Sequence, residues 1–125
     1  MKNLTIEAEA KFRKELKANL ENCGVCCDIR TYTTWYEGCN GAPNTLYDDN
    51  GDRVMIKEAI ELNLSGAYKV YVDVQFDSVA IWKPNKENKC FDLVNVFWFE
   101  DYKNKTAFSM ALACALGSIA NSTKD

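Results

Sequence analysis

The sequence predicts an α+β fold in which an antiparallel β-sheet of about four to six strands packs against an N-terminal amphipathic helix and an apolar C-terminal helix. Three observations predict it: helical periodicity over residues 8–20, strict alternation over 68–76, and a run of apolar helix-forming residues over 106–120. The chain has 125 residues, the size of one ordinary domain. We therefore expect a single globular domain over 1–125.

The first segment has the pattern of an amphipathic helix. Apolar residues recur at every fourth position, and charged residues fill the other faces. The apolar positions are Ala8, Phe12, Leu16 and Leu20. Gly24 can adopt the left-handed conformation that ends helices, so we expect the helix to end there.

The composition of the sequence changes over residues 27–47, where β-branched and aromatic residues dominate. Ile29, Thr31, Thr33 and Trp35 alternate with polar and aromatic residues, which predicts a strand over 29–36. Residues 37–44 are rich in Gly, Asn and Pro and predict a loop. Asn50-Gly51 predicts a hairpin turn, and the apolar spacing over 56–64 predicts a short helix.

The next part of the chain predicts β-structure. The alternation over 68–76 predicts a strand, and 79–82 continues it after a tight turn or a bulge at Asp77-Ser78. The polar segment 83–89 predicts a hairpin tip. Residues 91–99 are almost continuously apolar, as expected for a central strand that is covered on both faces.

The last predicted element is a helix from about 106 to 120, with Thr106 as its N-cap. It is apolar nearly all round, so it must be covered on several sides. Either it lies between the sheet and the first helix, or it contacts a second copy of the chain. A homodimer through this helix is therefore one of the expected arrangements.

Charge and composition exclude several function classes. The net charge is -3, which argues against a nucleic-acid partner. No signal peptide or membrane-spanning run is seen, so we expect a cytoplasmic protein with its cysteines reduced. The chain contains no histidine, which removes Ser-His-Asp and Cys-His catalysis and His-based metal sites.

The remaining metal patterns are incomplete. Cys23, Cys26 and Cys27, with Cys39, lack the second Cys pair of a structural zinc site, and their place at a helix end favours packing. The acidic run 48–52 fails the ligand spacing of a calcium loop and is better explained as a hairpin turn.

A carboxylate site is the least favoured reading. Asp73, Asp77 and Glu87 are the candidates for a small metal-dependent hydrolase, but Glu87 falls in a turn-rich segment that gives a metal no rigid support. We therefore predict no catalytic residue, no metal site and no cofactor.

The segment 32–47 has the composition of a recognition surface. Tyr, Trp and Asn offer large contact area together with adaptable hydrogen bonding. Its expected partner-binding residues are Tyr32, Trp35, Tyr36, Asn40 and Tyr47. The alternative is a strand that places one aromatic face in the core.

By exclusion, we expect a non-catalytic interaction protein that binds and modulates another macromolecule, most simply a protein. Its size and acidity match the inhibitors of host defence that bacteriophages and mobile elements encode, such as anti-CRISPR proteins. The alternative is a homo-oligomer that binds or sequesters a nucleotide-like small ligand, using Arg30, Arg53 and Tyr71.

Overall fold

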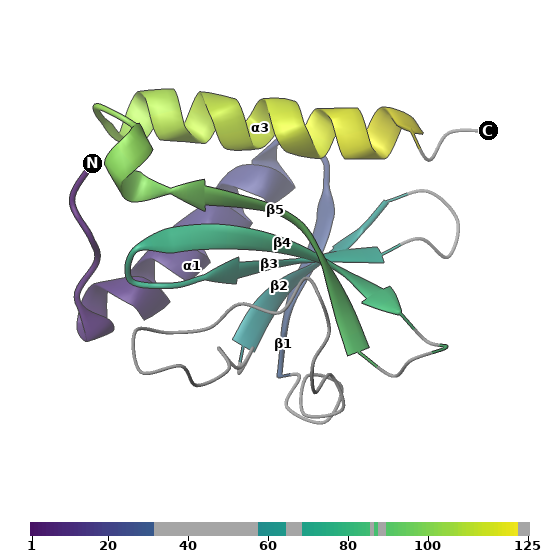
Figure 1. Ribbon diagram of the computed structural model, residues 1–125. Helices are drawn as coiled ribbons and strands as arrows, with labels where there is room; N and C mark the ends of the chain where they lie inside the picture. The colour runs from purple at the N-terminus through teal and green to yellow at the C-terminus, as the bar shows by residue number, and fades with distance from the viewer. Residues whose placement is uncertain (32–57, 65–68, 86, 88–89, 123–125) are drawn as a thin grey trace.

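The computed structural model describes residues 1–31, 58–64, 69–85, 87 and 90–122. The described residues form two α-helices and a five-stranded antiparallel sheet, which confirms the α+β prediction (Figure 1). The elements are α1 (Ile6–Asn22), β1 (Cys26–Thr31), β2 (Glu58–Asn63), β3 (Lys69–Val74), β4 (Ser78–Asn85), β5 (Cys90–Trp98), a 3₁₀ turn (Phe99–Asp101) and α3 (Lys105–Ser122).

The sheet is a simple meander. Its strands lie in the order β1-β2-β3-β4-β5, and each pairs antiparallel with the next. The register aligns Ile29, Ile60, Val72 and Ile81 in one row across four strands. Because side chains alternate along a strand, this row marks one face of the sheet, which we call the helix face.

Both helices pack on the helix face (Figure 1). Phe12 of α1 and Phe108 of α3 join the core there, with their ring centroids 6.2 Å apart. Phe99, in the turn between β5 and α3, lies 5.0 Å from Phe108. These edge-on aromatic contacts fix how the two helices sit on the sheet.

The opposite face of the sheet, which we call the second face, has its own cluster of buried side chains. The cluster consists of Ala59, Tyr71, Ala80, Trp82 and Phe91, with Leu93 and Val96 partly buried against it. Residues on both faces of the sheet are therefore buried. For this reason β2, β3 and β4 do not show the simple alternation of buried apolar and exposed polar residues.

The predicted helix ends are found in the structure, except that the N-cap of α3 lies two residues earlier than expected. The Thr5 hydroxyl accepts a hydrogen bond from the Ala8 amide and caps α1, and Gly24 has a φ of +85° just after the helix, as predicted. In α3, the Asn104 side chain accepts from the Ala107 amide at 2.9 Å. The cap is therefore Asn104, and Thr106 lies inside the helix.

The predicted helix over 56–64 is wrong, because residues 58–63 form strand β2. Ala59 and Ile60 are consecutive apolar residues that point to opposite faces, and both are fully buried. β2 lies between β1 and β3, so apolar residues are needed on both of its faces. In a short segment this spacing resembles one face of a helix.

The strand over 91–99 exists, but its predicted central position is wrong. β5 is the last strand of the sheet formed by the described residues. Its apolar run is explained by two contacts: Phe97 packs on the helix face, while Phe91 packs on the second face. A register shift opposite Ile81 and Trp82 marks a bulge there.

The β3–β4 connection is the tight turn rather than the bulge at 77–78, since the Gln75 amide donates to the Ser78 carbonyl at 2.8 Å. β4 continues to Asn85, so the tip predicted over 83–89 begins later than expected.

β1 ends at Thr31. The rest of the strand predicted over 29–36, the loop over 37–44 and the Asn50-Gly51 turn lie outside the described residues.

The aromatic packing of Phe108 predicts a large stability difference between two positions in α3. Phe108→Ala should lower the free energy of unfolding by about 3–5 kcal/mol, because it leaves a cavity between both helices and the sheet. Met110→Ala, on the exposed side of the same helix, should change it by less than about 0.5 kcal/mol. Equilibrium denaturation by urea measures both, and equal losses would contradict this packing.

Candidate functional site

All five residues predicted to bind a partner lie outside the described residues. Tyr32, Trp35, Tyr36, Asn40 and Tyr47 do so, together with Arg53 and Cys39. The recognition surface over 32–47 therefore stays a prediction. Arg30 and Tyr71 are described, in β1 and β3.

The outer side of α3 is exposed, although the sequence predicts a helix covered on several sides. Phe108, Leu112 and Leu116 pack into the core. The other side of the helix has Met110, which is 64% exposed, with Ala113, Cys114 and Gly117 also exposed. We call these four residues the α3 outer face. Residues 106–123 include no charged side chain, which is unusual for a helix side that meets water.

A shallow groove runs between α3 and α1 beside this face. Its volume is about 460 Å³, and it is lined by Asn19, Lys105, Thr106, Ser109, Met110 and Ala113. A smaller hollow of about 170 Å³ lies next to it and shares Lys105. The Lys105 ammonium is 3.1 Å from the Glu15 carboxylate and 5.3 Å from the centroid of the Phe12 ring. Met110 and the groove together form an apolar surface with one lysine at its edge.

Other exposed apolar side chains do not extend this surface. Phe76 lies in the β3–β4 turn, and Trp98 lies at the end of β5, opposite Ser78. Single exposed aromatic residues are common on protein surfaces and require no partner.

On the second face, Arg30 and Tyr71 meet at the buried carboxylate of Glu61. The Tyr71 hydroxyl donates to Glu61 Oε2 at 2.9 Å. Arg30 Nε and Lys69 Nζ lie 3.8 Å and 3.5 Å from Glu61 Oε1. Two of the three residues predicted for a small anionic ligand are therefore brought together. However, Glu61 already engages both, so an anion would have to displace this carboxylate.

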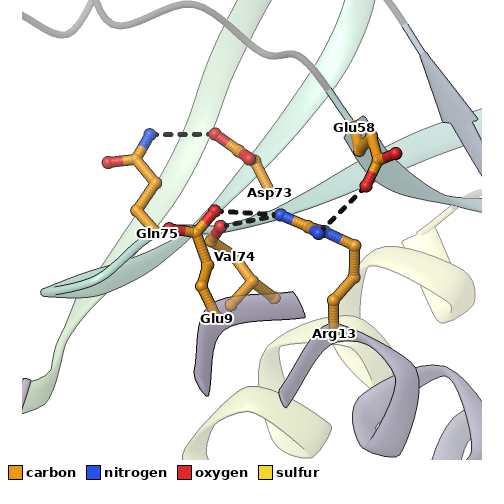
Figure 2. A network of polar contacts seen from close by, with 6 residues as sticks. All are labelled: Glu9, Arg13, Glu58, Asp73, Val74 and Gln75. Carbon is orange, nitrogen blue, oxygen red and sulfur yellow. Dashed lines mark hydrogen bonds and ion pairs between the residues drawn. The ribbon is translucent and has the colours of Figure 1, made fainter. Parts of the chain in front are cut away.

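Arg13 is the central cation of a network that joins α1 to the sheet (Figure 2). Only 6% of the residue is exposed. Its guanidinium donates to Glu9 Oε1 at 3.0 Å, to Glu58 Oε2 at 3.2 Å and to the Val74 carbonyl at 3.4 Å. Glu9 is on α1, whereas Glu58 and Val74 belong to β2 and β3. The network therefore attaches α1 to two strands at one point.

Asp73 lies beside this network and is 4% exposed (Figure 2). Its Oδ2 accepts a hydrogen bond from Gln75 Nε2 at 2.8 Å. Burial raises the pKa of Asp73 to about 7, against the opposing effects of the Gln75 hydrogen bond and the Arg13 charge. The sequence indicates Asp73 only as a candidate metal ligand and does not show that its carboxyl is buried in the middle of a sheet.

The carboxylates predicted for a metal-dependent hydrolase do not converge. Asp77 precedes β4 and Glu87 follows it, so the eight residues of Ser78–Asn85 separate them. At about 3.3 Å per residue this is on the order of 25 Å, far beyond the span of a metal site. Among the described residues, no group of three Cys, Asp or Glu side chains is arranged to hold a metal ion.

The cysteines that follow α1 do not lie together on one face of the sheet either. Cys26 and Cys27 are consecutive in β1 and therefore point to opposite faces of the sheet. Cys26 is exposed, whereas Cys27 is half-buried on the helix face. Burial, chiefly, raises the pKa of the Cys27 thiol to about 11, so this thiol is protonated and unreactive at neutral pH.

The Arg13 network predicts a strong response to its removal. Arg13→Ala should lower the free energy of unfolding by about 2 kcal/mol, less than for a fully enclosed ion pair because the Glu58 side chain is half exposed. Lys11→Ala removes another i,i+4 pair on α1, with Glu15, and should cost less than about 0.5 kcal/mol. Thermal and urea denaturation compare the two variants. Equal effects would show that burial adds nothing to the network.

Comparison with protein-family models, curated proteins and solved structures finds no match to this chain. None of the helices in the described ranges has the length and apolarity needed to cross a membrane. Function is therefore argued from the chemistry and geometry of the surfaces described above.

Proposed function

We propose that this chain is a non-catalytic binding protein that holds a helix of a protein partner against the α3 outer face. One observation carries the proposal: an 18-residue helix buries one side and leaves an uncharged, partly apolar side exposed beside a groove. Covering the α3 outer face removes apolar area from water at little desolvation cost, because its four residues carry no charge.

The residues of this face suit close helix packing. Ala113 and Gly117 have little or no side chain, so a partner helix could approach within about the 8–10 Å that packed helices adopt. Met110 is flexible and polarizable, which lets it adapt to different apolar partners. The groove toward Asn19 would receive side chains from the partner, as in helix-in-groove recognition.

A second copy of the chain is the simplest source of such a helix. It would present the same uncharged face, which gives a self-complementary two-fold interface. A different protein would be modulated by losing access to its own helix, which is how a small inhibitor of host defence would act. For either case we propose a reducing compartment such as the cytoplasm, in which an exposed cysteine such as Cys114 stays a thiol.

A pair of lysine substitutions tests the surface. Ala113→Lys places a charge in the proposed interface and should weaken assembly or partner binding by at least about tenfold. Ala10→Lys is the matched control, since it adds the same charge to an exposed alanine of α1 that lines neither the groove nor the smaller hollow. Native mass spectrometry over a concentration series measures self-association, and affinity capture followed by titration measures binding to another protein.

Alkylation of cysteines gives an independent readout. In the assembled state, Cys114 should react with a maleimide at least about tenfold more slowly than in the free protein, because a partner helix excludes the reagent. Exposed Cys26, on the second face, should react at the same rate in both states. A protein that binds its partner with Cys114 fully reactive, or equal binding by both lysine variants, would refute the α3 outer face as the contact surface.

A further inference from the structure

The second face contains two buried carboxyl groups, and the structure treats them differently. Glu61 and Asp73 are each 4% exposed. Glu61 has two cations within 4 Å and accepts a hydrogen bond from Tyr71. Asp73 has the amide of Gln75 as its hydrogen-bond donor, and none of the ion pairs among the described residues includes it.

The position of Asp73 in the sheet explains why no ion pair among the described residues includes it. It lies on β3, in the middle of the five strands, with Ala80 of β4 directly opposite. Continuing the Ile60–Val72 pairing places Ala59 of β2 on its other side. Neither alanine can neutralise a charge or replace the water that an ionised carboxylate loses on burial.

The charged groups on the elements around Asp73 do not compensate for this. The titratable or charged residues there are Glu9 and Arg13 on α1, Glu58 and Glu61 on β2, and Lys69 and Tyr71 on β3, with Arg30 of β1 beyond Ala59; the second-face residues of β4 are Ser78, Ala80 and Trp82. The cations among them already have partners. Arg13 is engaged by Glu9, Glu58 and the Val74 carbonyl, and Arg30 and Lys69 are engaged by Glu61. A buried carboxyl in this position is expected to keep its proton.

We propose that Asp73 is a proton-operated latch: its carboxyl is protonated while β2, β3 and β4 are closed around it, and loss of the proton loosens both the centre of the sheet and the attachment of α1. The coupling to α1 follows from geometry. Arg13 already binds the carbonyl of Val74, the residue next to Asp73. A negative charge on Asp73 attracts the guanidinium away from Glu58 and repels the Glu9 carboxylate, so the Arg13 network must rearrange (Figure 2).

The direction of the pH effect is set by which state binds the proton more tightly. Burial raises the pKa of Asp73 to about 7 in the folded protein, from an ordinary value of 3.8. Between these values the unfolded chain releases the proton and the folded protein retains it. The contribution of Asp73 to stability is therefore complete below about pH 4, falls as the pH rises through 7, and is then lost.

Two measurements test the latch on the isolated protein. The carboxyl ¹³C shift of Asp73, followed against pH in the wild type, should titrate with a midpoint near neutrality. The unfolding equilibrium constant should rise by tenfold to about a hundredfold between pH 5 and pH 8 through this group. Asp73→Asn should abolish that rise, because the amide accepts from Gln75 without carrying a charge. Asp101→Asn, an exposed control, should retain it.

Hydrogen exchange distinguishes a latch from a passive buried acid. After correction for intrinsic rates, amides of Val72, Val74 and Arg13 should exchange at least about tenfold faster at pH 8 than at pH 6 in the wild type, and equally in Asp73→Asn. A carboxyl midpoint below pH 5, or a pH-dependent rise that survives in Asp73→Asn, would overturn the proposal. Unchanged protection at those amides would do so as well. If Asp73→Asn does not fold, the carboxyl titration and the amide exchange of the wild type still test the proposal.

Discussion

The structure depends on one constraint: a five-stranded sheet has to be buried on both faces, while both described helices lie on the same face. The helix face meets this constraint with a continuous apolar core centred on Phe12, Phe99 and Phe108. The second face meets it with a mixture of aromatic residues, small residues and carboxyl groups. The structure therefore has to bury several charged or ionisable side chains in and beside this sheet.

Charge is accommodated in three ways that follow from local geometry. Glu61 is held by Tyr71, Arg30 and Lys69, which reach it from neighbouring strands because the meander places β1 and β3 on either side of β2. Arg13 is held by carboxylates and a backbone carbonyl from three elements. Asp73 has alanines as its cross-strand neighbours, so the least costly solution is to remain uncharged.

The same constraint leaves α3 with a free side. The helix covers the sheet with one stripe, spaced at 108, 112 and 116, and that stripe is enough to close the core. The four residues of the α3 outer face do not pack into this core, yet they carry no charge. Surfaces that serve only solvation normally carry charged residues, and this contrast is the reason we propose contact with another helix at the α3 outer face.

What the sequence determined was set by local signals. Thr5, Gly24 and the four-residue spacing defined α1, and the alternation over 68–76 defined β3, because caps and periodicity act within a few residues. Tertiary structure decided the rest. Residues 58–63 form a strand because neighbouring strands on both sides bury both of its faces. Among the described strands β5 is the last despite its apolar run, and α3 has one exposed side. The roles of Glu61 and Asp73 were equally hidden in the sequence, because burial and the distance to a cation are properties of neighbours brought together only by folding.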